Sequence, residues 1–372
     1  MMKKFILFCI LCSVLHGCKE SAEEQGCPVI YADIEKIDKV SFFDIFSRAE
    51  IIPLETNDSS LIKYIYKVVY DNNRYYVFDY MQAEILTFDE AGKFLFKISD
   101  RGQGPEEYLN ISDFDIDKQN DRIVVLDPIN NAMFEYDLSG NFITRYKLPR
   151  ITNAYKSFIY LNTDTLVYFT FDYDNRLKFY SKSKGVIFKE LYPEKDNVLY
   201  NITLEFPYET TFFRSADNVV YEITQGCELT EKYRWDFGKL NNSKKQISKF
   251  DNIHNTMSLF PKVHNSEIIN YIFTVQGRFS DFLCSRVVRK NKKIHIFHDQ
   301  KNQKNYIFDK TSENATFHPL SWQDDFVIGY YADEWGHIDD TLPDAILDSL
   351  NISIKKSLKD DSNPVLIKYY FK

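Results

Sequence analysis

The same pattern of residues occurs twice in this chain, at positions 48 residues apart. In each copy an apolar run ends in Asp, a second apolar run ends in another Asp, and a Gly follows three positions later. The matching pairs are Asp79 and Asp127, Asp89 and Asp137, Gly92 and Gly140, and Phe94 and Phe142. Short apolar runs separated by turn residues predict β-strands. Four strands in about 48 residues are the size of one propeller blade, so the repeat predicts a β-propeller.

The step from Asp89 to Gly92, and its counterpart from Asp137 to Gly140, predicts a hairpin turn between two strands of a blade. An Asp side chain accepts local backbone hydrogen bonds in such turns, and Gly adopts the positive φ that the turn requires.

Later apolar runs are less regular copies of the same unit. They lie at 166–188, 219–237, 282–308 and 326–371. With the two strict copies they predict an all-β fold of six blades, each of four antiparallel strands, although five or seven blades remain open. The aromatic fraction of 16% also favours strands. Residues 29–54 are expected to complete a terminal blade, because pairing strands from both chain ends removes an open sheet edge.

Two segments interrupt the strand pattern. Residues 239–268 are polar and predict a helix or a long loop. Residues 340–360 place Ile346, Leu350 and Ile354 at helical spacing after Pro343. This spacing predicts a short amphipathic helix packed on the propeller.

The first 17 residues have the organisation of an export signal, with Lys3 and Lys4 before an apolar run at 5–15. That run is too short to cross a hydrocarbon core of about 30 Å. The sequence Leu-His-Gly-Cys that ends at Cys18 resembles a lipobox, although its His is unusual there. We therefore expect cleavage before Cys18 and lipidation of its thiol. The alternative is an ordinary signal peptide cut nearby, with Cys18 incidental.

Residues 18–28 are polar and acidic and predict a flexible tether, which leaves 29–372 as the propeller domain. Acyl chains on Cys18 would hold the protein at a membrane, since each buried methylene contributes about 0.8 kcal/mol. Lys-Glu directly after Cys18 resembles the signals that send Bacteroidetes lipoproteins to the cell surface. The expected location is the cell envelope, on the outer membrane, with the cell surface as the alternative.

The charge of the chain argues against nucleic acid as a partner. Loss of Lys3 and Lys4 with the signal changes the net charge from −8 to −10, because no acid leaves with them. A surface this negative repels phosphate backbones. The expected partners are instead an unidentified glycan or protein, and the membrane through Cys18.

Cysteine and histidine usage predicts no cofactor and no metal. Cys27, Cys227 and Cys284 remain in the mature chain without metal-ligand spacing, although one disulfide is possible. His295 and His298, three positions apart on a strand, would point to opposite faces and make a poor metal pair. No nucleophile, zinc-protease or phosphate-loop motif is present, so no catalytic residue is proposed.

The segment Arg101-Gly-Gln-Gly-Pro-Glu-Glu-Tyr108 carries a family resemblance. With the strand runs 113–117 and 122–127 and the Gly140 turn that follow it, it resembles the NHL repeat. Over residues 50 to 372 the chain resembles the six-bladed propeller lipoproteins of Bacteroidetes. The resemblance implies the fold and the location, and implies no chemistry. Glu106 stands where the repeat usually has Gly, a departure that affects the local turn.

If the fold is a propeller, residues 101–108 link the outer strand of one blade to the inner strand of the next. Such links share a face with the loops at 80–84 and 128–132. Four side chains are therefore expected to line the mouth of the channel and contact a ligand: Arg101, Gln103, Glu106 and Tyr108. The alternative is structural, with Gly102, Gly104 and Pro105 shaping a tight crossing and Tyr108 packed between blades.

The predicted propeller, its anchor and its composition are compatible with two functions. The first is a binding or scaffold module that recognises a glycan, peptide or partner protein, favoured by the acidic, aromatic-rich composition and the anchor. The second is an extracellular propeller hydrolase or lyase acting on a carbohydrate or lactone. Because no catalytic motif is present, we expect that the protein is not an enzyme.

Overall fold

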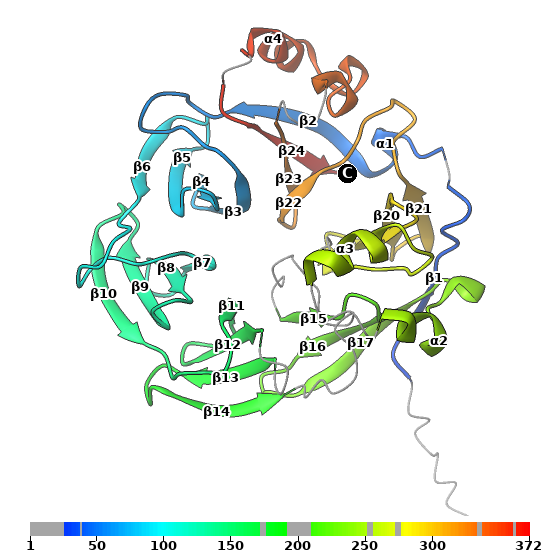
Figure 1. The fold of residues 1–372 in the computed structure, drawn as a ribbon. Helices are drawn as coiled ribbons and strands as arrows, with labels where there is room; N and C mark the ends of the chain where they lie inside the picture. Colours follow the sequence, from blue (N-terminus) through cyan, green and yellow to red (C-terminus); the bar gives the residue numbers. More distant parts are fainter. Residues whose placement is uncertain are drawn as a thin grey trace, which may run out of the picture.

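A computed structural model describes residues 26–37, 39–171, 176–191, 210–250, 256–271, 277–332, 337–359 and 362–372. Six four-stranded sheets surround a central axis (Figure 1). The predicted six-bladed propeller is confirmed.

We number the blades in chain order of their inner strands. Blades 1 to 3 are continuous in sequence. They comprise β3 (Ile65–Asp71), β4 (Arg74–Asp79), β5 (Glu84–Asp89) and β6 (Phe94–Ile98); β7 (Asp113–Asp117), β8 (Arg122–Asp127), β9 (Ala132–Asp137) and β10 (Phe142–Lys147); and β11 (Tyr155–Tyr160), β12 (Thr165–Thr170), β13 (Leu177–Ser181) and β14 (Val186–Leu191).

Blade 5 is also continuous, whereas blades 4 and 6 each receive their outer strand from the N-terminal segment. Blade 4 comprises β15 (Thr211–Phe213), β16 (Val219–Ile223), β17 (Leu229–Asp236) and β1 (Val29–Tyr31). Blade 5 comprises β18 (Gly277–Phe279), β19 (Phe282–Arg289), β20 (Lys292–Asp299) and β21 (Lys304–Phe308). Blade 6 comprises β22 (Pro319–Trp322), β23 (Phe326–Tyr331), β24 (Val365–Phe371) and β2 (Phe46–Pro53).

The N-terminal segment supplies the outer strand of two blades rather than one. β2 pairs antiparallel with β24, the closure expected for residues 29–54. β1 instead pairs in parallel with the end of β17, two blades away. Between them the chain passes blade 5, where Asn305 Nδ2 donates to the carbonyl of Tyr31 at 2.6 Å. One segment therefore covers the outer edges of two sheets.

The repeated Asp and Gly form the predicted hairpin turns. Asp89 Oδ1 accepts the N–H groups of Ala91 and Lys93 at 3.0 and 2.8 Å. Gly92 has φ +82°, and Gly140 at the same place in blade 2 has φ +84°. These are left-handed conformations that a side chain disfavours.

Replacing Gly92 with Ala is expected to lower the free energy of unfolding by about 2 kcal/mol, through left-handed strain and steric conflict. A Cβ at this position would lie 2.1 Å from the carbonyl oxygen of Pro53, a backbone atom that cannot move aside cheaply. Urea unfolding measures the change, with Gly226→Ala as the control, because the nearest atom to a Cβ there is 3.7 Å away. Equal stability of the two variants would contradict this prediction.

Asp79 and Asp127 have the structural role expected for residues after the second strand. Asp127 Oδ1 accepts the N–H groups of Ile129 and Asn130, and its Oδ2 accepts the N–H of Leu109 at 2.8 Å. Asp79 bonds in the same way to its own turn and to the N–H of Lys63. Each carboxylate thus fastens the link from the preceding blade to the loop after a second strand.

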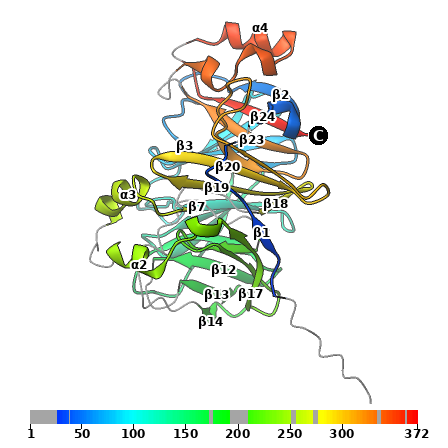
Figure 2. The same cartoon turned by 90° about the vertical axis from the view of Figure 1, so that its right-hand side faces the viewer.

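The polar segment 239–268 contains helices as well as loops. It includes α2 (Lys244–Ile247) and α3 (Thr256–His264). Figure 2 shows the two helices on the same side of the ring. Their connections bond to the β15–β16 turn of blade 4, where Asn242 Nδ2 donates to the carbonyl of Ala216 at 3.0 Å, and to the β19–β20 turn of blade 5, where the N–H of Lys290 donates to the carbonyl of Ser266 at 2.8 Å.

The predicted helix within 340–360 is shorter than its sequence pattern. α4 spans Ser349–Ser357 and begins at Asp348, which caps it by accepting the N–H of Asn351 at 2.8 Å. Ile346 lies in a separate 3-10 turn, and the extended Leu347 breaks the helical register between them. Leu350 is consequently 66% exposed, so its predicted packing is wrong, whereas Ile354 packs against the core.

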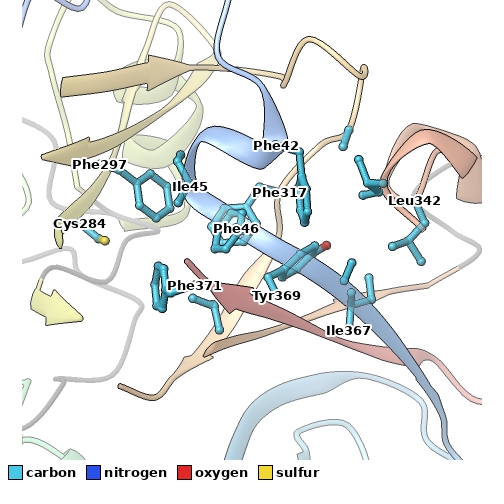
Figure 3. Packing of buried hydrophobic residues seen from close by; sticks show 14 of the residues in the cluster. Phe42, Ile45, Phe46, Cys284, Phe297, Phe317, Leu342, Ile367, Tyr369 and Phe371 are labelled. Carbon is cyan, nitrogen blue, oxygen red and sulfur yellow. The ribbon is translucent and has the colours of Figure 1, made fainter. Parts of the chain in front are cut away.

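The ring closure has its own aromatic core (Figure 3). The short helix α1 (Phe42–Ile45) leads into β2, whose first residue, Phe46, is 1% exposed. The Phe46 ring lies 5.2 to 5.8 Å from five other rings, namely Phe42, Phe297, Phe317, Tyr369 and Phe371. These residues join blades 5 and 6 and the N-terminal segment.

Candidate functional site

An axial cavity of about 460 Å³ lies among the inner strands of four blades. Its walls come from β3, β7, β11 and β22, which surround the centre of the ring in Figure 1. The lining extends past the strand ends into Lys118 and Gln119 of blade 2, Asn162 and Thr163 of blade 3, and Gln323 of blade 6. The cavity therefore reaches the turns between first and second strands.

The sequence-predicted ligand residues lie at the opposite ends of the strands. The Tyr108 hydroxyl donates to the carbonyl of Ala83 at 2.7 Å, and Leu109 N–H bonds to Asp127, so the link 101–108 meets the loops after second strands. This is the face expected for the link. None of the four predicted residues lines the axial cavity.

Within that link, Arg101, Gln103 and Glu106 are exposed, whereas Tyr108 is fully buried. The Tyr108 ring packs 6.2 Å from that of Phe134, so its side chain cannot touch a ligand in this conformation. The interblade packing considered as the alternative describes this residue.

The two glycines of the link make room for a neighbouring side chain. Glu107 Oε2 accepts the N–H of Gly104 at 2.7 Å. A Cβ on Gly102 would lie 1.9 Å from the Glu107 carboxylate. The segment Gly-Gln-Gly-Pro-Glu-Glu is thus a self-packed turn that its own acid stabilises.

A buried ion pair adjoins the axial cavity. Lys67 Nζ donates to Asp113 Oδ1 at 2.8 Å and to the carbonyl of Phe114 at 2.7 Å. Asp113 Oδ2 accepts the N–H of Phe158 at 3.0 Å. One carboxylate therefore connects blades 1, 2 and 3. Burial raises the pKa of the Asp113 carboxyl to about 6, although the Lys67 ammonium opposes this shift.

Two further ammonium groups nearby are held in ion pairs. Lys118 Nζ is 3.5 Å from Asp71, and Lys182 Nζ lies between Asp117 and Glu135 at 3.6 and 3.4 Å. Together with the Lys67 pair, these contacts hold each of three ammonium groups against a carboxylate.

Asp115 differs from these acids. It is half-buried, it lines the cavity, and its Oδ1 accepts only the adjacent N–H of Ile116, at 2.8 Å. In the described parts of the chain it forms no ion pair.

Aromatic side chains complete the cavity wall. Tyr66, Tyr70, Tyr160 and Trp322 all line it. Within the described residues, the Tyr160 hydroxyl and Trp322 Nε1 are buried and lack a hydrogen-bond partner. Burial raises the pKa of Tyr160, so its hydroxyl stays protonated and able to donate.

Sequence reasoning missed these cavity residues. Asp113, Asp115 and Asp117 alternate with Phe114 and Ile116 in β7, so the three acids share one face of an inner strand. The sequence did contain a signal for this site: a predicted inner strand that has a carboxylate at every second position.

The remaining candidates of the sequence have packing roles or lie outside the described residues. His295 stacks on Phe308 at 5.4 Å, and His298 Nδ1 lies 2.8 Å from Asn305 Oδ1. Cys27, Cys227 and Cys284 are free thiols, so the possible disulfide does not form. Cys18 lies outside the described residues.

Among the described residues, no group of three or more His, Cys, Asp or Glu is placed to hold a metal ion. No helix there is long and apolar enough to cross a bilayer.

Two solved structures share this fold. A protein of Bacteroides fragilis NCTC 9343, described as a candidate exported protein, superimposes with a TM-score of 0.71 at 16% identity, covering 92% of this chain and 99% of its own. A member of the DUF4221 family from Bacteroides vulgatus superimposes with a TM-score of 0.56 at 10% identity, covering 91% of this chain and 99% of its own. At these identities the likeness concerns the fold alone.

No curated protein matches the sequence. A family model described as "Domain of unknown function (DUF4934)" matches residues 28–370, which is nearly the whole chain. The protein therefore belongs to the DUF4934 family, whose members share this domain and whose description assigns it no activity.

Proposed function

We propose that the protein is an exported, lipid-anchored binding module whose axial cavity receives a small polar ligand. The observation that carries the proposal is the cavity itself. Its volume of about 460 Å³ lies within the range of small-molecule sites. It also combines tyrosine rings with side-chain amides and with the Asp115 carboxylate, which forms no ion pair among the described residues, and such groups bind a polyhydroxylated molecule from several sides.

A saccharide of two or three rings suits this wall better than an extended protein surface does. The polar groups converge from four blades on one concave space, whereas a protein partner needs about 800 Å² of surface on each side. The exposed residues Arg101, Gln103 and Glu106 lie at the other ends of the strands and are free to contact a macromolecular partner.

The cavity is tested by blocking its rim. Thr163 is exposed at the rim, so Thr163→Trp should fill the opening without disturbing the core. We expect this variant to lose at least tenfold in affinity for any disaccharide that a calorimetric panel identifies. Lys310→Trp, at an exposed residue outside the lining, should bind as the unchanged protein does. Binding that survives Thr163→Trp would place the ligand elsewhere.

The anchor is supported by the sequence around Cys18, by the acidic tether at 18–28, and by the description of the Bacteroides fragilis structure as a candidate exported protein. We expect Cys18→Ser to move the protein from the membrane fraction to the soluble fraction, because a serine hydroxyl is not lipidated. Mass spectrometry of the mature N-terminus provides the direct measurement. An unmodified residue 18 in the unchanged protein would refute the anchor.

A further inference from the structure

The chain between β1 and α1 lies on the outside of the ring. β1 pairs with β17 at three positions, and its Val29 and Tyr31 side chains are 61% and 59% exposed. Figure 1 shows the chain then running past the rim of blade 5 to α1. Along this run the carbonyl of Tyr31 accepts from Asn305 Nδ2 at 2.6 Å, and the carbonyl of Val40 accepts from the Ser312 N–H at 2.7 Å. The segment is therefore attached at a few separate points.

One row of apolar side chains fastens this segment to the propeller. Ile30, Ala32 and Ile34 are 7%, 0% and 4% exposed, and they pack in a cluster whose other members come mainly from blades 4 and 5. None of the three belongs to the aromatic cluster that closes the ring at blade 6. The row covers the rim of two blades without taking part in the closure.

The ring closure begins where this segment ends. The Ser41 hydroxyl donates to Glu313 Oε1 at 2.5 Å, and the Phe42 N–H donates to Glu313 Oε2 at 2.7 Å. Phe46 then enters the aromatic core, and β2 pairs with β24 at seven positions, compared with three for β1 and β17. Local opening of a protein starts where few paired residues and few buried contacts hold the chain. Residues 27–40 should therefore open more readily than the closure does.

We propose that the segment from Cys27 to Val40 is a strap, which detaches while the ring stays closed and so sets the reach of the propeller from its anchor. The reach rests on the lipid anchor of the proposed function. With the strap docked, nine residues lead from Cys18 to Cys27 and span at most about 30 Å. With the strap released, 23 residues lead from Cys18 to Ser41 and span at most about 80 Å. Release thus gives the propeller access to partners farther from the membrane.

Hydrogen exchange measured by mass spectrometry tests whether the strap detaches by itself. The full mature chain carrying Cys18→Ser is used, so that no anchor is involved. The Ala32 N–H, which donates to the carbonyl of Asp236 at 2.9 Å, should exchange at least a hundredfold faster than the paired amides of β2. Equal rates would mean that the strap opens only when the ring unfolds, which overturns the proposal.

Variants then release the strap on purpose. The double variant Ile30→Asp/Ile34→Asp places two carboxylates in the buried row, so it should speed trypsin cleavage after the exposed Lys36 at least tenfold. Exchange in β2 and β24 should stay unchanged. Ile37→Asp is the matched control, because Ile37 lies in the same segment but is 36% exposed, and it should leave cleavage unchanged. Loss of protection in β2 in the double variant would show that the ring depends on the strap, contrary to the proposal.

Neutron reflectometry of the anchored protein on a supported bilayer measures the reach. The double variant should lie about 10 Å farther from the lipid surface than Ile37→Asp, the difference between the r.m.s. lengths of 23 and nine flexible residues. Equal heights would overturn the role of the strap in setting the reach. Failure of the unchanged protein to attach to the bilayer would contradict the proposed anchor, whereas the exchange measurement would still decide whether the strap detaches.

Discussion

Asp113→Ala should lower the free energy of unfolding by about 3–5 kcal/mol, the cost of leaving one partner of a buried ion pair alone. The truncation removes the acceptor of Lys67 Nζ and of the Phe158 N–H, in a place where Asp113 is 0% exposed. Because this carboxylate joins three blades, the loss should spread along the inner strands. Urea unfolding at pH 7 is the measurement.

The double variant Asp113→Ala/Lys67→Met is the matched control. It removes the stranded ammonium as well as the carboxylate, so it should recover a substantial part of the lost stability. A double variant as unstable as the sum of the two single variants would mean that the two residues do not interact.

The same residue predicts how stability varies with pH. The folded pKa of Asp113 is about 6 and exceeds the ordinary value of 3.8, so between these values the folded state binds a proton that the unfolded state lacks. This group's contribution to the free energy of unfolding therefore rises as pH falls from 7 to 4, and is lost as pH rises through 6. The stability difference between the unchanged protein and Asp113→Ala should be larger at pH 5 than at pH 7. The opposite trend would show that the Lys67 charge outweighs burial.

Phe46→Ala should cost about 3–5 kcal/mol, as is typical when a buried aromatic ring is deleted from a core. Its ring contacts five others at the junction of β2, β20 and β24, and these contacts hold the N-terminal segment in the closing blade. We also expect faster proteolysis near β2, because loss of this ring weakens the pairing that covers the β24 edge.

Phe43→Ala provides the comparison for this variant. Phe43 lies next to Phe42 in α1 but is 40% exposed, and its ring packs edge-on against that of Phe42 at 5.2 Å. Its replacement should change the stability by less than about 1 kcal/mol. If both variants were equally destabilised, the helix itself rather than the aromatic junction would hold the closure.

The amino-acid sequence determined the blade because the information for a blade is local. The alternation of apolar residues, the Asp89 to Gly92 turn and its copy at Asp137 to Gly140 each depend on residues within a few positions of one another. Adjacent strands of a sheet of this kind are joined by short turns, so local patterns also give the order of strands within blades 1, 2 and 3.

Tertiary structure alone decided where the remaining pieces lie. The sequence pattern of residues 29–54 predicted one closing segment. In the structure its two strands belong to blades 4 and 6, because blade 4 ends at β17 and takes β1 as its fourth strand. The length of α4 likewise depended on the extended Leu347 and the cap at Asp348.

The candidate site shows the same division. The sequence motif from Arg101 to Tyr108 predicted a ligand site, but its glycines make room for the Glu107 carboxylate within the turn. The axial cavity has no contiguous motif, because β3, β7, β11 and β22 each contribute a few residues from places far apart in the chain. A ring brings its inner strands together only after it closes. Local sequence therefore determines the blades, while closure determines which carboxylates and rings face one another at the axis.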